Sequence, residues 1–302
     1  MKLKILGCYS ASPRKNSFPS SQILNINGNN LLVDCGEGTQ MQIRRCGIKF
    51  SSIENIFISH LHGDHFFGLP GLISTFRLMG RTKRLNIFGP NGIKDVINLI
   101  LKMGNSYIDF QINYIELEEK TPLKILENDL FSVSTIPLKH RIYTNGFMFT
   151  EKVRRKKLKL DKIKKLNIDE SFYNNIAMGK DVVLYDGTII NNKVITYPKE
   201  KDIVYSYCSD TAYSDKVIDI VKDSNALYHE STFLEKHNNL AKKTKHSTAA
   251  QAAMVAKKAN CKQLILGHFS SRYKNLKDFE IEAKTIFENV VLAEDGKEFD
   301  IS

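Results

Sequence analysis

The hexapeptide HLHGDH at residues 60–65 constrains this chain more than any other part of it. It directly follows the apolar run at residues 56–58, so we expect a buried strand that delivers metal ligands into a loop. A histidine-rich surface loop is the ordinary alternative for such a segment on its own. Imidazole and carboxylate groups suit zinc, and iron or manganese are possible, because these ligands select weakly among divalent metals.

The spacing within the hexapeptide points to two ions rather than one. His60 and His62 are two positions apart and can turn to the same side, whereas Asp64 and His65 are adjacent and must diverge. Gly63 would let the backbone bend sharply between the two ligand pairs. We therefore expect one loop to serve two metal ions.

The remaining candidate ligands come from distant parts of the chain. His140, Asp210 and His268 each follow an apolar, strand-like run. Ligands at the ends of several strands can meet at one edge of a sheet, which argues against a mere surface loop. His246 lies just before a helix that Thr248 and Gln251 should begin with a capping box. Near that helix start His246 can meet a phosphate without being a ligand.

Two acidic residues near residue 35 are candidates for supporting the site. Asp34 and Glu37 follow a predicted hairpin and open a short helix. Either carboxylate could accept a hydrogen bond from the N–H group of a metal-bound imidazole. A plain turn and helix cap would explain both residues as well.

Composition indicates a globular protein with a polyanionic partner. The 302 residues, 42% hydrophobic and 25% charged, can form one large domain or two modest ones. An excess of 44 basic over 33 acidic residues gives a net charge of +11, which favours nucleic acid first and an anionic membrane surface second. Genome-wide use of lysine could also produce this excess.

The chain shows no membrane or secretion signal. Its apolar runs fall short of the ~20 residues that span a bilayer, and residues 2–7 alternate like a strand. The five cysteines are scattered along the chain, and no two of them have the short spacing of a metal-binding motif. This distribution is expected for reduced, buried thiols. We expect a cytoplasmic protein that does not bind membranes.

Strand and helix patterns alternate along the chain, which predicts a sheet-centred α/β fold with helices outside. A hairpin is predicted at residues 21–34, turning at Asn27-Gly28, after a polar basic loop at residues 10–17 that could face a phosphate backbone. The other predicted strands are residues 2–8, 84–89, 110–117, 129–136, 144–150, 205–210 and 226–228, and the predicted helices are residues 68–79, 91–103, 214–223 and 248–258.

Composition changes abruptly at residue 151. Residues 151–165 carry nine cations against two anions, and residues 166–180 stay polar. With few apolar residues at core spacing, this insertion should bury little and project from the body, which resumes at Val182. We interpret residues 151–180 as a nucleic-acid-binding arm; a solvated basic helix without a partner is the alternative.

These motifs together resemble the metallo-β-lactamase superfamily and, within it, the short form of tRNase Z (ribonuclease Z). The similar segments cover nearly the whole chain: DCGEGTQ at 34–40, ISHLHGDHFFGLPGL at 58–72, His140, Asp210 within SDT, HEST at 229–232, HST at 246–248 and GHFSSRY at 267–273. The HxHxDH pattern is shared by the superfamily, whereas HST and GHxSSRY are more specific.

The resemblance implies an αββα sandwich over residues 1–302 with two Zn²⁺ ions and a protruding basic arm. One zinc would be held by His60, His62 and His140, the other by Asp64, His65 and His268, with Asp210 bridging them. The resemblance also implies that Asp64 accepts a proton from the attacking water, that His246 donates one, and that Glu230 orients His246.

The implied function is removal of the 3′ trailer from precursor tRNA by a zinc-dependent endoribonuclease, usually a homodimer, leaving a 3′-hydroxyl and a 5′-phosphate. Two rival functions stay open: a phosphodiesterase, arylsulfatase or lactonase of the same fold that acts on small substrates, and a tRNA-binding protein with an inactive site.

Three segments depart from the family pattern. They are a shortened loop at 13–16, residues 171–175 in place of a Gly-Pro-rich segment, and Ser209 where glycine is common.

Overall fold

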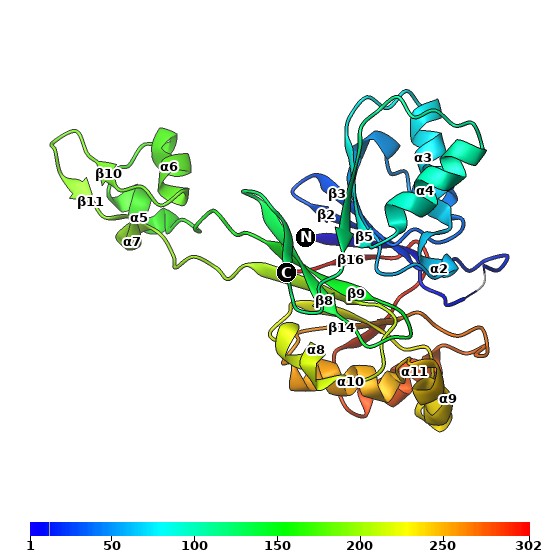
Figure 1. The fold of residues 1–302 in the computed structure, drawn as a ribbon. Helices are drawn as coiled ribbons and strands as arrows, with labels where there is room; N and C mark the ends of the chain where they lie inside the picture. Colours follow the sequence, from blue (N-terminus) through cyan, green and yellow to red (C-terminus); the bar gives the residue numbers. More distant parts are fainter. Residues whose placement is uncertain (12) are drawn as a thin grey trace.

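The computed structural model describes residues 1–11 and 13–302 and shows two β-sheets packed face to face with helices on both outer sides (Figure 1). This is the predicted αββα arrangement. Ser12, within the predicted basic loop, lies outside the described residues. Among the described residues, no helix is both long and apolar enough to cross a membrane.

The first sheet contains the N-terminal strands and one strand from the C-terminus. Its seven strands are, in order, β16 (Glu298–Asp300), β1 (Lys2–Gly7), β2 (Ser21–Ile26), β3 (Asn29–Val33), β4 (Ile53–Phe57), β5 (Leu85–Pro90) and β6 (Ile112–Leu117). The predicted hairpin is confirmed by β2 and β3. Its central residues Asn27 and Gly28 have φ values of 49° and 86°, as a type I′ turn requires.

The second sheet is built from strands that lie between residues 124 and 292. Its seven strands are, in order, β15 (Val290–Leu292), β14 (Leu264–Gly267), β13 (Ala226–Glu230), β12 (Ile203–Cys208), β9 (Asn145–Glu151), β8 (Phe131–Pro137) and β7 (Lys124–Glu127). The short strands β7, β15 and β16 were not predicted, because runs of three or four residues show no usable alternation.

Helices cover the outer face of each sheet (Figure 1). The first sheet is covered by α1 (Thr39–Arg45), α3 (Gly68–Leu78) and α4 (Ile93–Met103), and the second by α8 (Asp215–Ile220), α10 (Ala249–Lys258) and α11 (Lys277–Lys284), with α9 (Asn238–Thr244) on the same side. The shorter helices are α2 (Gly63–Phe66), η1 (Phe50–Ser52) and η3 (Glu235–His237). The capping box of Thr248 and Gln251 at α10 is confirmed.

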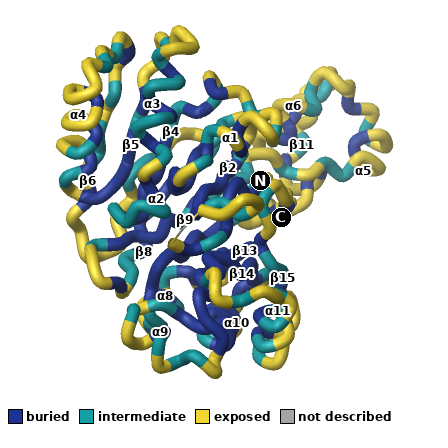
Figure 2. The backbone as a smooth tube through the Cα atoms, turned by 90° about the vertical axis from the view of Figure 1, so that its right-hand side faces the viewer, coloured by how far each residue is buried: buried dark blue, intermediate teal, exposed yellow. Residues whose placement is uncertain are grey.

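The core between the sheets is rich in aromatic rings, and Figure 2 shows the central strands as buried. Phe57 of the first sheet lies 5.5 Å from Phe147 and 5.4 Å from Phe149 of the second, between ring centroids. Full burial of one such ring stabilises the fold by roughly 1.5–3 kcal/mol. This packing keeps the two sheets, and the loops at their edges, in a fixed relation.

Residues 152–202 leave the second sheet between β9 and β12 and form a projecting segment (Figure 1), which we call the arm. Its elements are α5 (Leu160–Lys165), η2 (Glu170–Phe172), α6 (Tyr173–Ala177), β10 (Val182–Val183), β11 (Ile189–Ile190) and α7 (Asn192–Ile195). The predicted end at residue 180 is wrong, because Val182 pairs with Ile190 inside the arm rather than with the main sheet.

The arm also has a small core of its own, contrary to the prediction that it buries little. Ile163, Ile176 and Ile195 are fully buried in one cluster. Asn192, only 3% exposed, donates hydrogen bonds from Nδ2 to the carbonyl oxygens of Ile176 and Lys180. These contacts join parts of the arm that are far apart in sequence, so periodicity could not reveal them.

Candidate metal centre

The predicted ligands meet at one edge of the sandwich because of strand direction. Strand β9 runs antiparallel to both β8 and β12, while β12, β13 and β14 run parallel to one another. Strands β8, β12 and β14 therefore all end at the same edge, where His140, Asp210 and His268 follow them. The first sheet contributes the segment after β4, so residues from both sheets converge there.

Four ligand atoms form a first group, belonging to His60, His62, His140 and Asp210. They lie within 4.8 Å of one another. His62 Nδ1 is 3.0 Å from His60 Nε2 and 3.4 Å from His140 Nε2. Ring nitrogens that face each other this closely favour a positive charge between them.

A second group contains Asp64, His65 and His268. His65 Nε2 lies 3.3 Å from His268 Nε2, and Asp64 Oδ2 lies 3.5 and 3.4 Å from those two nitrogens. His268 has a φ of 59°, an unusual conformation for a residue other than glycine, and such strain is typical of functional sites.

Asp210 connects the two groups. Its Oδ2 atom lies 3.5 Å from His60 Nε2 and 3.6 Å from His140 Nε2. Its Oδ1 atom lies 3.3 Å from His65 Nε2 and 3.1 Å from His268 Nε2. One carboxylate thus offers one oxygen to each group.

Hydrogen bonds at the back of the rings fix which nitrogen faces the centre. The Nδ1–H group of His140 donates to the Lys245 carbonyl at 2.9 Å, which leaves Nε2 as the free ligand atom. Thr232 Oγ1 donates to Glu230 Oε2 at 2.7 Å, so it accepts from His268 Nδ1 at 2.9 Å. In both rings Nε2 is therefore the nitrogen that faces the other candidate ligands.

Asp34 is the acidic residue that supports the cluster. Its Oδ2 atom accepts from His65 Nδ1 at 2.8 Å and from the hydroxyl groups of Tyr207 and Ser59. Of the two acidic residues singled out in the sequence, Asp34 contacts the candidate ligand His65, whereas Glu37 is exposed at the rim of the cavity. Asp34 therefore holds His65 in place from behind.

The electrostatics of the cluster suit a bound cation. Burial lowers the pKa of His60 and His140, and lowers that of His62 to about 4, so these rings are neutral at neutral pH. Burial alone would raise the pKa of Asp210, but His268 and His65 beside it hold it well below its usual range. The neutral imidazoles of His60, His62 and His140 and the Asp210 carboxylate form a donor set that zinc prefers.

Gly63 has a different role from the predicted one. It lies in the first turn of α2 and is not among the glycines with positive φ. A Cβ atom there would approach the Phe67 ring to 2.4 Å. A side chain at residue 63 would therefore displace the Phe67 ring, which is 58% exposed at the mouth of the cavity.

His246 and Glu230 form a pair beside the metal groups. His246 Nδ1 lies 2.8 Å from Glu230 Oε1, and Glu230 is fully buried. Glu230 also accepts from the N–H groups of Thr211 and Thr232. Burial lowers the pKa of His246, but the Glu230 carboxylate outweighs this and raises it to about 9. Because Nδ1 faces Glu230, Nε2 is the atom available to a substrate.

The cluster opens into a cavity of about 550 Å³. The N–H group of Ala11 donates to Asp64 Oδ2 at 2.8 Å, so the predicted basic loop reaches the site. Arg141 lines the cavity, is exposed, and makes no ion pair with any residue that the structure describes. Arg141 was not predicted from the sequence, although its position beside His140 was a usable signal.

Known proteins resemble this chain over its whole length. The family model described as "Anti-Pycsar protein Apyc1" matches residues 1–289. A protein named ribonuclease Z from Bacteroides thetaiotaomicron is 42% identical over 295 residues, which cover 98% of this chain and 93% of that protein.

Solved structures agree with the sequence relatives. The crystal structure of human tRNase Z, short form, has a TM-score of 0.73 and 27% identity, with 100% of both chains covered. The metallo-β-lactamase fold protein YhfI from Bacillus subtilis has a TM-score of 0.70 with 99% of each chain covered. At 18% identity, the second similarity shows the fold alone.

Proposed function

We propose that this chain, which belongs to the ribonuclease Z family, cuts RNA with two bound zinc ions. It also belongs to the sequence family described as "Anti-Pycsar protein Apyc1". It is a tRNA 3′-processing endoribonuclease, a function supported by relatives named ribonuclease Z and by the structure of human tRNase Z, short form. The relatives do not favour the rival activity on small substrates. The observation that carries the two-ion proposal is Asp210, which offers one oxygen to each group of ligands.

The residues present fit two zinc ions. His60, His62 and His140 would hold one ion, Asp64, His65 and His268 the other, and Asp210 would contact both. Ions bound there would supply a strong nucleophile from water at neutral pH and would offset charge on the phosphoryl oxygens. The complete donor set also argues against a tRNA-binding protein with an inactive site.

Side chains of the protein itself would transfer protons and position the substrate. Asp64, held by the Ala11 N–H group, would accept the proton of the attacking water. His246 would donate a proton from Nε2 to the departing ribose 3′-oxygen, with Glu230 fixing the ring. Arg141 would pair with a phosphate oxygen. The products are a tRNA with a 3′-hydroxyl and a trailer with a 5′-phosphate.

The direct test is cleavage of a 3′-extended tRNA transcript by protein loaded with Zn²⁺. We expect one cut at the tRNA 3′ end, loss of cleavage after chelation, and recovery when Zn²⁺ is returned. Mapping the ends of both products checks the position and the chemistry. An uncut transcript in the presence of bound zinc would contradict the assignment.

The arm is the proposed binding site for the body of precursor tRNA. Lys162, Lys164 and Lys165 lie exposed on α5, and none forms an ion pair with a described residue. Unpaired lysines on a projecting helix can contact backbone phosphates. Folded RNA is recognised largely through its shape and backbone, which suits an arm distant from the cutting site.

We expect conversion of these three lysines to glutamine to raise KM for precursor tRNA about tenfold and to weaken its salt dependence. Hydrolysis of bis-p-nitrophenyl phosphate, which is too small to reach the arm, should stay the same. Excising residues 154–200 should have a larger effect. Glu151 pairs with Ile203 across β9 and β12, so a short linker can close the gap. Equal losses on both substrates would contradict this role.

A second copy of the chain is the proposed partner for an apolar surface on α3 and α4. Both helices cover the same sheet between parallel strands, so their C-terminal ends are neighbours (Figure 1). Leu78, Leu99, Met103 and Tyr107 are 82%, 59%, 76% and 78% exposed there. Leu78 ends α3, Leu99 and Met103 belong to the second half of α4, and Tyr107 follows that helix. Large exposed apolar side chains near two neighbouring helix ends are typical of protein interfaces, and most soluble oligomers are symmetric dimers.

We expect L78E combined with M103E to convert a dimer into a monomer, measured by size-exclusion chromatography with light scattering. Ile281 on α11, 65% exposed on the opposite outer layer, provides the control: I281E should leave the mass unchanged. A wild-type protein that stays monomeric at high concentration would contradict the proposal.

We also propose a cytoplasmic location. All five cysteines lie among the described residues, and none of them forms a disulfide. Reduced thiols are typical of proteins in the cytoplasm.

A further inference from the structure

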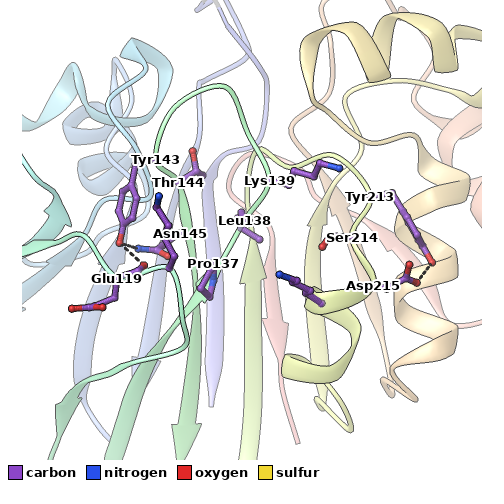
Figure 3. A pocket seen from close by; sticks show the side chains of 12 residues that line it. Glu119, Pro137, Leu138, Lys139, Tyr143, Thr144, Asn145, Tyr213, Ser214 and Asp215 are labelled. Atoms are coloured by element: carbon purple, nitrogen blue, oxygen red, sulfur yellow. Dashed lines mark hydrogen bonds between the residues drawn. The ribbon is translucent and has the colours of Figure 1, made fainter.

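A second cavity lies beside the metal centre and has no part in the mechanism above. It has a volume of about 630 Å³ and opens between the loop after β8 and the segment before α8 (Figure 3). We call it the lateral pocket and define it by Lys120, Lys139, Tyr143, Tyr213 and Lys216, which all line it.

The lateral pocket and the active-site cavity lie on two sides of one loop. His140 is flanked by two exposed cations: Lys139 lines the lateral pocket and Arg141 lines the active-site cavity. The backbone N–H group of Lys139 donates to Thr211 Oγ1 at 3.1 Å, and its carbonyl accepts from Ala212 N–H at 2.9 Å. A strand of RNA that leaves the active site at Arg141 could therefore enter the pocket at Lys139.

The charges of the pocket favour phosphate. Lys120, Lys139 and Lys216 form no ion pair with any residue in the described part of the chain. Asp215, by contrast, already accepts a hydrogen bond from the Tyr213 hydroxyl at 2.9 Å and lies 3.5 Å from Lys258 Nζ. Glu119 also lines the pocket, is exposed and forms no ion pair with a described residue. Three unpaired cations therefore stand against one unpaired carboxylate, so the free charge around the pocket is mainly positive.

Two tyrosine rings stand on opposite sides of the pocket (Figure 3). Tyr143 is held by its hydroxyl, which donates to the Glu119 carbonyl at 3.0 Å and accepts from Asn145 Nδ2 at 2.8 Å. The Tyr213 hydroxyl is held by Asp215 and Lys258. Rings fixed in this way lose little conformational entropy when a base stacks on them. Cationic walls with aromatic rings are the usual features of a site for single-stranded nucleic acid.

We propose that the lateral pocket binds a nucleotide of the single-stranded RNA next to the scissile phosphate. The lysines contact its phosphate groups, and a tyrosine ring stacks on its base. The volume exceeds what a lone phosphate needs. This inference rests on the proposed function, since it concerns the same RNA strand, and the nucleotide can come from either side of the cut.

The test uses the double variant K139A/K216A in the full-length, zinc-loaded protein. The contacts of Lys139 with residues 211 and 212 are made by its backbone, so alanine preserves them. With a precursor that carries a trailer of six nucleotides, we expect KM to rise about tenfold. The slope of log KM against log salt should fall by about 1.4, because each contact on a single strand contributes about 0.7.

Precursors with trailers of one and six nucleotides identify the side of the cut. A rise in KM for the long trailer alone places a trailer nucleotide in the pocket. An equal rise for both places a nucleotide of the tRNA end there, and also supports an RNA site. Unchanged KM and salt dependence with both precursors would overturn the proposal. K222A, which removes an exposed lysine beyond the other end of α8, is the control and should behave as wild type.

Replacement of Tyr213 tests stacking separately from charge. Y213F keeps the ring but loses the hydroxyl bonds to Asp215 and Lys258, so it should raise KM by no more than about twofold. Y213L, which also removes the ring, should raise it about tenfold, in line with the ≈1–3 kcal/mol of a stacked base. Equal effects of the two variants would overturn the stacking contact. If wild-type protein cleaves no precursor, the proposed function fails; if it cleaves and these variants match it, only the pocket proposal fails.

Discussion

Replacing Asp210 with alanine is expected to abolish tRNA cleavage and to reduce zinc content at both positions. Asp210 is 3% exposed and lies within 3.6 Å of four ligand nitrogens. Bound metal stabilises the transition state by several kcal/mol, and 1.36 kcal/mol corresponds to a factor of ten in rate. We therefore expect kcat to fall by at least about 10³-fold, measured with a 3′-extended tRNA under saturating conditions.

Elemental analysis separates the role of Asp210 from that of a ligand in one group. H62A should mainly weaken binding of the zinc ion in the first group, because the ring nitrogens closest to His62 Nδ1 belong to His60 and His140. D210A should weaken the binding of both zinc ions. D219A removes an exposed carboxylate of α8 and should leave zinc content and rate unchanged. Full zinc content in D210A would contradict the bridging role.

The seven candidate ligands could be predicted from sequence because strand direction determines where they meet. An apolar run that ends in histidine or aspartate already implies a ligand at a sheet edge, and β8, β12 and β14 all end at the same edge. The sequence could not show which oxygen of Asp210 faces which group. That detail depends on the packing of both sheets around Phe57 and Tyr207.

Other features had no periodic signal to predict them. The core of the arm joins Ile163, Ile176 and Ile195, whose spacing fits neither a helix nor a strand. Gly63 suggested backbone freedom, whereas in the structure its φ is not positive and a Cβ atom there would displace the Phe67 ring. The lateral pocket depends on residues 139 and 216, which are far apart in sequence and lie among many other lysines.

Replacing His246 with alanine is expected to slow tRNA cleavage by about 10²–10⁴-fold, the usual contribution of a general acid. Zinc content should stay the same, because His246 Nδ1 is bonded to Glu230 and lies 4.0 Å from Asp210. Glu230 keeps its bonds to Thr211 and Thr232, so the variant should remain folded, and H246N provides a second test. Loss of one zinc ion would instead make His246 a ligand.

The leaving group and the pH profile distinguish an acid from a structural residue. Bis-p-nitrophenyl phosphate releases a stable anion that needs no proton, so H246A should slow its hydrolysis far less than that of tRNA. The protonated ring is the active form, so wild-type kcat should fall as pH rises through the pKa of His246. The Glu230 carboxylate raises that pKa. E230Q should therefore move the alkaline fall to lower pH. An unmoved alkaline limb in E230Q would mean that another group supplies the proton.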